Sequence, residues 1–280
     1  MSADWSTSPT GTLTSGGKSL EYACWGPGPD TAPTIVLLHE GLGCVALWRD
    51  FPQRLADATG WGVFAFSRVG YGQSDPAVLP RPLDYMTREA IDVLPEVLDQ
   101  IGFRTGILFG HSDGATIAAI HAGSVVDHRV RGLVLMAPHF FTEPMGLAAI
   151  AEARMAWEKG DLPAKLGKYH ANAEVAFKGW NDAWLAPGFQ DWDVSDVIDY
   201  IRVPALAIQG KDDQYGTLAQ LDEIVDHSYA PVDTLVLENC QHAPHLECTD
   251  KVLEEVAEFV VRLERIEAAQ PEGDLTNFAL

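Results

Sequence analysis

The sequence predicts an α/β protein, with a mostly parallel sheet covered by helices on both faces and a helical insertion between two strands. Short apolar runs recur along the chain, with helix-like patterns between them. From residue 34 onward most of these runs are continuously apolar, which is typical of strands that are buried on both faces. Residues 139–200 contain no convincing strand but hold four of the eight tryptophans. Strands that alternate with helices indicate parallel strands joined by crossovers.

The predicted elements alternate along most of the chain. Pro95 should kink the helix that we expect at residues 87–101, or reset its first turn. We expect strands at residues 20–25, 34–39, 63–67, 106–110, 132–137, 204–209 and 234–237. We expect helices at residues 47–58 and 87–101, the second with Ile91, Leu94, Leu98 and Ile101 on one stripe. The clearest amphipathic helix lies near the end and carries Val252, Val256, Phe259, Val260 and Leu263.

The chain is long enough, at 280 residues, for one large domain that carries an insertion. We expect the domain core to comprise residues 13–138 and 201–267. Residues 139–200 would form a helical cap over the C-terminal edge of the sheet. The tryptophans of this cap either hold it together or face the site below it. Residues 1–12 and 268–280 are expected to be flexible termini.

Composition narrows the functional classes. Acidic side chains outnumber basic ones by 40 to 19, and the formal net charge is −21. This field repels phosphate groups, so we expect neither nucleic-acid nor membrane binding. The amino terminus has no cationic region with an apolar stretch behind it, and the four cysteines form no C-x-x-C pair. We therefore expect a cytoplasmic protein with reduced thiols. Because the sequence has no H-E-x-x-H, H-x-x-E-H, Walker or strand-following G-x-G-x-x-G motif, we expect no metal and no cofactor, a small-molecule substrate, and a possible homo-oligomer.

The stretch "GHSDG" places Ser112 between two glycines, after a predicted strand and before a small, apolar, helix-like run. A strand that turns directly into a helix forces the central residue to a positive φ and brings the two backbones together. Small residues are then needed at minus two and plus two, which are Gly110 and Gly114. The serine hydroxyl would stand above the sheet at a helix N-terminus, where developing negative charge is favoured. This pattern is the G-x-S-x-G nucleophile elbow.

A serine nucleophile needs a base, and the base needs an acid that orients it. Downstream, an apolar strand is followed by "GKDDQYG", which contains Asp212 and Asp213. A second strand is followed by "HAPHLE", which contains His242 and His245. Both groups follow parallel strands, so they would meet the serine at the C-terminal edge of the sheet, where open α/β sheets carry their sites.

These motifs together resemble the α/β-hydrolase superfamily, of the capped serine hydrolase or esterase type. The resemblance covers about residues 34–263 and includes "LLHEGLG" and "SRVGYGQSDP" as well as the three motifs above. It implies the α/β-hydrolase fold and a Ser112–Asp213–His242 triad, in the chain order of that family. Asp213 is selected because the family's acid stands three residues after the glycine, and His242 because the base is the first histidine of its motif.

The resemblance also implies an oxyanion hole made by two backbone N–H groups, those of Asp113 and Gly41. The chain departs from the family at Glu40, which occupies the place of a glycine. Carboxylates at Glu40 and Asp113 would oppose an oxyanion if they were unpaired. We therefore expect both to point away or to be paired, with Arg68 as the nearest cation. Alternatively, one of them contacts the leaving part of a substrate that is neutral.

The predicted activity is hydrolysis of a carboxylic ester or lactone. Glu40, His139, Trp180 and Trp184 are the candidate pocket residues, and the aromatic cap favours a substrate with an apolar part. Carbon–carbon bond hydrolysis, amide hydrolysis, acyl transfer and ligand sensing by a receptor with a retained triad are the alternatives on the same scaffold. Among the other histidines, the resemblance gives His39 and His111 a role in orienting loops, and we expect His121, His128, His170 and His227 at the surface.

Overall fold

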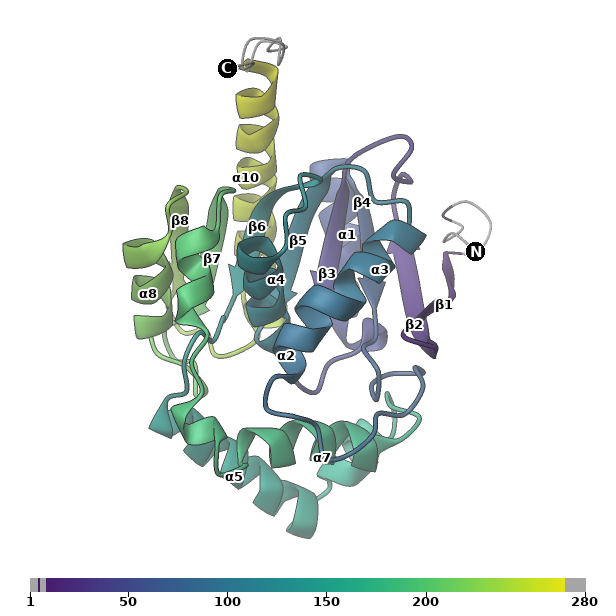
Figure 1. The fold of residues 1–280 in the computed structure, drawn as a ribbon, viewed down its shortest axis with the longest axis vertical. Coiled ribbons are helices and arrows are strands. Elements are labelled where there is room, and N and C mark those ends of the chain that lie inside the picture. Colours follow the sequence, from purple (N-terminus) through teal and green to yellow (C-terminus); the bar gives the residue numbers. More distant parts are fainter. Residues whose placement is uncertain (1–4, 6–8, 270–280) are drawn as a thin grey trace, which may run out of the picture.

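An eight-stranded sheet forms the centre of the molecule (Figure 1). The structure, a computed structural model, describes Trp5 and residues 9–269. The strand order is β1-β2-β4-β3-β5-β6-β7-β8, in which β1, β2 and β4 pair antiparallel and all the other neighbours pair parallel. The strands are β1 (Thr10–Ser15), β2 (Lys18–Trp25), β3 (Thr34–Leu38), β4 (Gly62–Phe66), β5 (Gly106–His111), β6 (Val130–Met136), β7 (Ala205–Gly210) and β8 (Val232–Leu237). The predicted α/β architecture is confirmed.

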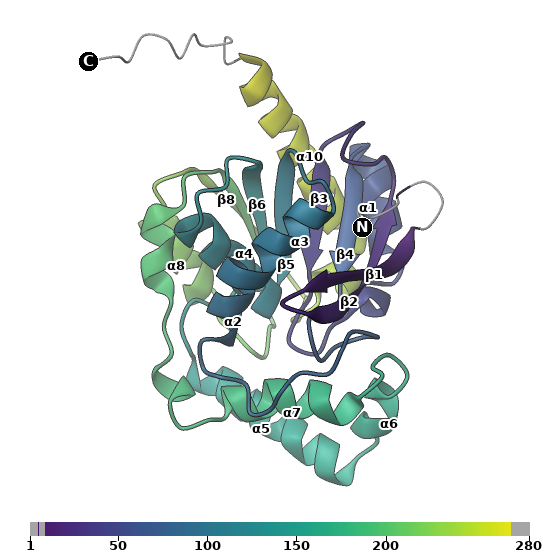
Figure 2. The same ribbon diagram turned by 45° about the vertical axis from the view of Figure 1, so that its right-hand side comes forward.

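Helices cover both faces of this sheet, as Figures 1 and 2 show. One face carries α1 (Phe51–Thr59) and α10 (Thr249–Ala269), which pack against each other. The opposite face carries α2 (Tyr85–Arg88), α3 (Leu94–Gln100), α4 (Asp113–Ser124) and α8 (Ala219–His227). Because both faces are covered, the central strands can be apolar at every position.

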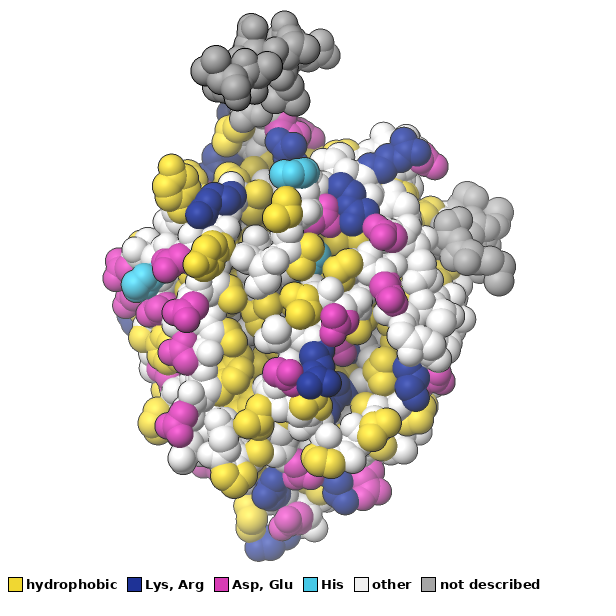
Figure 3. Space-filling view, viewed as in Figure 1, with side chains coloured by type: hydrophobic (Ala, Val, Ile, Leu, Met, Phe, Trp, Pro, Cys, Tyr) yellow, Lys and Arg dark blue, Asp and Glu magenta, His cyan; other side chains and the backbone are white. Residues whose placement is uncertain are grey.

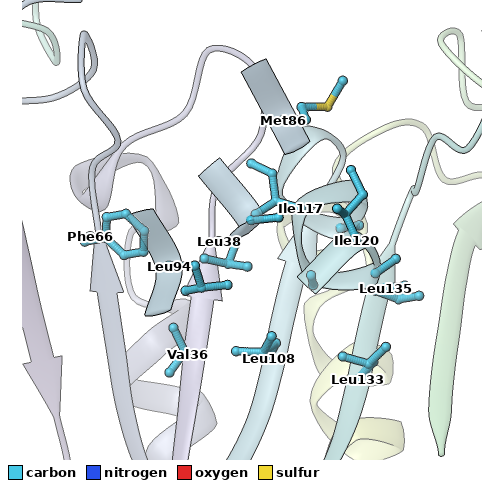
Figure 4. Packing of buried hydrophobic residues seen from close by; sticks show 14 of the residues in the cluster. Val36, Leu38, Phe66, Met86, Leu94, Leu108, Ile117, Ile120, Leu133 and Leu135 are labelled. Atoms are coloured by element: carbon cyan, nitrogen blue, oxygen red, sulfur yellow. The ribbon is translucent and has the colours of Figure 1, made fainter. Parts of the chain in front are cut away.

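The strand β3 shows how this pattern builds two cores. All five of its residues are buried, and successive side chains point to opposite faces of the sheet. Val36 and Leu38 pack with Leu94 and Ile117 from the helices of one face (Figure 4). Ile35 and Leu37 belong to the other core, with side chains of α1 and α10. Burial of each such side chain contributes about 1.5–3 kcal/mol.

The segment between β6 and β7 forms helices that lie at one end of the sheet (Figures 1 and 2). Its main helices are α5 (Pro144–Lys159), α6 (Leu162–Leu166) and α7 (Ala173–Trp184). Short 3₁₀ helices at Phe189–Asp191 and Ser195–Tyr200 follow them. We call residues 139–200 the cap. Its first residues are tied to the core, because Thr116 Oγ1 donates to the His139 carbonyl at 2.6 Å and Gln220 Oε1 accepts from Phe140 N at 2.7 Å.

The predicted helix 87–101 is interrupted. Residues Glu89–Val93 form a π-helical turn between α2 and α3, and Pro95 lies in the first turn of α3, as expected for a proline that resets the helix. The wider π turn rotates the residues before Pro95 relative to those after it. Ile91 is therefore 42% exposed, and its predicted place on the buried stripe is wrong. Leu94, Leu98 and Ile101 are buried, as predicted.

Other boundaries also differ from the predictions. The helix predicted at residues 47–58 is a 3₁₀ turn at Val45–Trp48 followed by α1, which begins at Phe51. Residues 10–12, predicted to belong to a flexible terminus, lie in the edge strand β1. This strand was missed because it is mostly polar and exposed. At the other end, α10 includes residues 268 and 269. The remaining predicted termini, 1–4, 6–8 and 270–280, lie outside the described residues.

Within the described part of the chain, none of the helices combines the length and the apolar character that crossing a membrane would require.

Candidate active site

A cavity of about 90 Å³ lies where the loops after β3, β5, β6, β7 and β8 meet the cap. Its wall therefore combines loops at the strand ends of the core with side chains of α5 and α7. The lining residues are Glu40, Gly41, Leu42, Ser112, His139, Ile150, Trp180, Trp184, Tyr215 and His242. A larger hollow of about 560 Å³ lies between the end of α4, β6 and α10, but it contains none of the predicted site residues.

Ser112 stands at the sharp turn between β5 and α4. Its backbone has φ 54° and ψ −120°, a strained conformation for a residue with a side chain, and it is the N-cap of α4. A Cβ on Gly110 would collide with the backbone of Gly114, and a Cβ on Gly114 would collide with the carbonyl of Leu38. The two glycines thus allow the close backbone approach that the sequence predicted, and the serine is held at the cavity wall.

Asp213 and His242 meet at the ends of β7 and β8. His242 Nδ1 lies 2.7 Å from Asp213 Oδ2, within hydrogen-bonding distance. The Asp213 side chain is fully buried and also accepts hydrogen bonds from Gln209 Nε2 and from the Tyr215 N–H, each at 2.8 Å. Three donors therefore fix this carboxylate, and the carboxylate in turn fixes the imidazole.

The environment of Asp213 keeps it ionised. Burial alone would raise the pKa of this carboxyl group, but the facing His242 and the hydrogen bonds from His242 and Tyr215 lower the pKa below its usual value. His242 is also held through its backbone, because His111 Nε2 donates to the His242 carbonyl at 2.6 Å. A charged carboxylate behind a fixed imidazole is the arrangement that a general base requires.

Ser112 and His242 line the same cavity, although no hydrogen bond joins the serine hydroxyl to the imidazole in this structure. Such contacts are often long without substrate and tighten in the complex. Asp212 and His245 are separate from this pair: Asp212 is exposed, and His245 is buried against the rings of Trp48 and Phe51. The structure thus brings together the three side chains that the motifs selected.

Asp113 points away from the cavity and is fully buried. Its Oδ2 accepts a hydrogen bond from the Tyr85 hydroxyl at 2.6 Å and lies 3.7 Å from Arg68 Nη2. The predicted pairing of this carboxylate with Arg68 is confirmed. A second buried partner, Tyr85, carries no recognisable motif and was missed by the sequence analysis.

Glu40 is paired differently from the prediction. Arg68 Nη2 donates to the Glu40 backbone carbonyl at 3.0 Å, whereas the Glu40 carboxylate lies 3.4 Å from His111 Nδ1. Burial raises the pKa of this carboxyl group, but His111 and neighbouring histidines outweigh that effect and hold the pKa far below its usual value. The side chain is 27% exposed and lines the cavity. The wall therefore carries a negative charge close to Ser112.

Gly41, the predicted second oxyanion donor, lies in the cavity wall against the cap. A Cβ at this position would collide with the indole ring of Trp180. Glycine is therefore required here for close contact between the loop after β3 and α7. Arg68 Nη2 links the two loops that carry the predicted donors, because it reaches both the Glu40 carbonyl and the Asp113 carboxylate.

The cap side of the cavity is aromatic. Asn172 caps α7 by accepting from the Val175 N–H at 3.0 Å, and Trp180 and Trp184 lie four residues apart on one face of this helix. His139 packs edge-on against Trp184, with ring centroids 5.4 Å apart. Burial, and then the nearby His242, lower the pKa of His139 to about 3, so this imidazole is neutral at ordinary pH.

Of the six predictions about these other histidines, four are confirmed and two are wrong; His128 and His227 are exposed, as expected. His39 orients the loop after β3, because its Nδ1 donates to the Glu40 carbonyl at 2.7 Å and its Nε2 accepts from Arg68 N at 3.0 Å. His111 anchors His242 as described above. His121 and His170, predicted at the surface, are buried. Both bind backbone groups of distant segments: His121 contacts the Ala90 carbonyl and His170 accepts from Gly72 N, contacts that no local pattern reveals.

No group of three His, Cys, Asp or Glu side chains in the described part of the chain is arranged to hold a metal ion.

Comparisons with known proteins agree with this fold. Residues 33–178 match the family model of the α/β hydrolase fold. A zearalenone hydrolase from Cladophialophora bantiana is 30% identical over 166 residues, which is 58% of this chain and 59% of that protein. The chain thus spans less than two thirds of the length of this curated relative.

Solved structures show the same fold. The crystal structure of VinJ superimposes with a TM-score of 0.74 at 24% identity, covering 91% of this chain and 99% of that one. A 2-hydroxy-6-oxo-6-phenylhexa-2,4-dienoate hydrolase from a Rhodococcus strain gives 0.72 at 18% identity, covering 90% and 98%. An enol-lactonase from Burkholderia xenovorans gives 0.67 at 19% identity, covering 90% and 100%.

Proposed function

The chain belongs to the α/β hydrolase fold family, and we propose that it is a serine hydrolase that cleaves a carboxylic ester or lactone. One observation carries the proposal: the 2.7 Å pair of Asp213 and His242 opens onto the same small cavity as the strained Ser112. A hydroxyl on a tight turn, a fixed imidazole and a buried carboxylate are the three parts that nucleophilic acyl transfer needs.

In the proposed reaction the Ser112 oxygen attacks the substrate carbonyl while His242 takes the hydroxyl proton. The backbone N–H groups of Gly41 and Asp113 stabilise the negative charge on the carbonyl oxygen. The tetrahedral intermediate then expels the alkoxide, which receives the proton from His242, and an acyl-enzyme remains. Water attacks this ester with His242 again as base, and the acid is released. Asp213 stabilises the imidazolium that forms in each step.

Two features support a neutral substrate with an apolar part. The ionised Glu40 in the wall disfavours an anionic group beside Ser112, and Trp180, Trp184 and Tyr215 offer an aromatic surface. The likeness to a zearalenone hydrolase supports a lactone as the cleaved group. The cavity of about 90 Å³ is smaller than the several hundred Å³ usual for ligand pockets. A large lactone would therefore require the cap to move.

The experiment is a panel of chromogenic esters of graded acyl length together with zearalenone, assayed with the wild-type chain and with Ser112→Ala. We expect repeated turnover of at least one neutral ester or lactone by the wild type, and none by the variant. Equal activity in the two proteins, or no turnover of any ester or lactone by the wild type, would contradict the proposal. Faster turnover of a carboxylate-bearing ester than of its neutral isostere would contradict the inference about charge.

The remaining expectations extend this proposal. The net charge of −21 supports an enzyme that binds neither nucleic acid nor anionic membranes. We propose a cytoplasmic location from the amino terminus and the cysteine pattern, and a homo-oligomer remains open. On the face drawn in Figure 3, Lys and Arg side chains are interspersed with Asp and Glu and do not gather into a basic patch.

A further inference from the structure

A chain of buried hydrogen bonds links the cap to the nucleophile turn. The Trp184 indole Nε1 donates to the Tyr85 hydroxyl oxygen at 3.1 Å, and the Tyr85 hydroxyl donates to Asp113 Oδ2 at 2.6 Å. Trp184 belongs to α7 in the cap, Tyr85 opens α2, and Asp113 is the residue after Ser112. In Figures 1 and 2, α2 lies at the end of the core that faces α7.

This series of hydrogen bonds is shielded from water, and the donor and the acceptor of each bond are fixed. The relative exposure of Trp184, Tyr85 and Asp113 is 4%, 3% and 0%, so water does not compete for these bonds. An indole nitrogen can only donate, which makes the Tyr85 oxygen the acceptor and sends its single proton to Asp113. Burial and the Asp113 charge raise the pKa of Tyr85 well above its usual value, so the hydroxyl keeps that proton.

The two end residues of this series of hydrogen bonds stand in different relations to the cavity. Trp184 lines the cap side, while Asp113 follows Ser112 and supplies the proposed oxyanion N–H from the core side. The other partner of the Asp113 carboxylate, Arg68, lies 3.7 Å away, so Tyr85 makes the closer contact with it. Every other residue that lines the cavity from the cap, including Trp180, lacks a hydrogen bond that ties its side chain to the core.

We propose that Tyr85 is a specificity-determining residue, whose hydroxyl latches Trp184 to Asp113, holds the cap closed and limits the size of the acyl or alcohol group that the cavity accepts. This proposal rests on the proposed function for its substrate readout. A closed cap keeps the cavity near 90 Å³. Without the hydroxyl, α7 is released at Trp184 and larger substrates are admitted.

The test compares Tyr85→Phe with Tyr71→Phe as a matched control. Both tyrosines are buried, and the guanidinium of Arg81 lies over both rings. The Tyr71 hydroxyl has no hydrogen-bond partner among the described residues, so its loss breaks no such link. We expect Tyr85→Phe to raise the ratio of kcat/KM for a long-chain ester to kcat/KM for the acetate ester by about fivefold. This factor corresponds to the net free energy that one typical hydrogen bond contributes. Tyr71→Phe should leave the ratio unchanged.

A purely structural role would lower kcat/KM for all esters by the same factor, and an unchanged ratio in Tyr85→Phe would overturn the proposal. An equal rise of the ratio in Tyr71→Phe would overturn it too, because the effect would then not depend on the latch.

A second measurement does not depend on hydrolysis. Hydrogen–deuterium exchange should be faster in Ala173–Trp184 of Tyr85→Phe than of the wild type, with α10 unchanged. Trp184→Phe breaks the same link but leaves the bond from Tyr85 to Asp113 intact, so it should show the same faster exchange even if Tyr85→Phe folds poorly. Unchanged exchange of α7 in Trp184→Phe would contradict the latch. If the wild type hydrolyses no ester, the proposed function fails, while the exchange experiment still decides whether the latch exists.

Discussion

The two halves of the cavity are built in different ways. On the core side, Asp213 is fixed by three hydrogen-bond donors, and His242 is held by Asp213 and by His111. On the cap side, the wall is made of Trp180, Trp184 and Ile150, which are held mainly by packing. The core half lies on the ends of strands, and the cap half lies on helices inserted between β6 and β7.

We infer from this difference that the core side carries out the chemistry and the cap side selects the substrate. Acyl transfer needs atoms held within fractions of an ångström, which strand ends and buried hydrogen bonds provide. Choice of substrate needs only a surface of the right size and polarity, which a helical insertion can vary without disturbing the sheet. On this account, substitutions in the core half should change the rate for every substrate, and those in the cap half should change the preference among substrates.

The largest expected effect is that of Ser112→Ala. Loss of the nucleophile should lower kcat on the order of a millionfold for every substrate. The fold should survive, because the change removes one hydroxyl at a cavity wall. Steady-state kinetics with a melting curve of the same sample checks both expectations. A selective loss, confined to some substrates, would break the division between the two halves.

Asp213→Asn should come next. The amide keeps the shape but removes the charge that fixes the tautomer of His242, so kcat should fall by about 10⁴. The measurement is kcat for a fast ester across pH. The conserved shape of Asn makes a large loss of stability unexpected. If activity fell less than tenfold, the pair at 2.7 Å would not be the working acid and base.

Trp180→Ala tests whether the cap half sets the preference among substrates. It removes an aromatic wall beside Gly41 and enlarges the cavity, so we expect kcat/KM for small esters to fall and that for bulky esters to hold or rise. The ratio between the two should shift by about ten- to a hundredfold. A uniform loss for all esters would place Trp180 with the core half, where it would act on the chemistry itself.

The smallest effect concerns pH and stability. Burial and His242 lower the pKa of His139 to about 3, and burial and His111 lower that of His245 to about 3, against about 6.5 in an unfolded chain. Between these values the unfolded chain binds more protons than the folded one. The free energy of unfolding should therefore fall as the pH drops from about 6.5 towards 3, by about 1.4 kcal/mol per pH unit for each histidine.

Denaturant unfolding at pH 7, 6, 5 and 4 checks this slope. His139→Gln should make the slope shallower, whereas His128→Gln, at an exposed position, should leave it unchanged. Identical slopes in the wild type and His139→Gln would contradict the assignment of His139 as a buried, neutral group.

The comparison also explains what the sequence could predict. The turn at Ser112 was predictable because the two glycines and the positive φ are local consequences of a strand that turns directly into a helix. Asp213 and His242 were found because each follows a strand in the motif order of a familiar fold. The core half of the site can therefore be predicted from short stretches of sequence.

The partners of those residues were harder to predict. Tyr85 and Gln209 bind the site through contacts that depend on how α2, β7 and the cap pack, and neither belongs to a motif. His121 and His170 look polar in sequence but satisfy buried backbone groups of distant segments. The prediction that Ile91 lies on the buried stripe failed because of the π turn at Glu89–Val93. Such a turn rotates the helix, but the spacing of apolar residues in the sequence does not reveal it.

The measurement that tests the central claim most directly is peptide mass spectrometry of the chain after brief reaction with an activated ester and acid quenching. The account predicts an acyl group on Ser112, absent in Ser112→Ala and formed far more slowly in His242→Gln. An acyl group on a different residue, or one that forms at the same rate without His242, would contradict it.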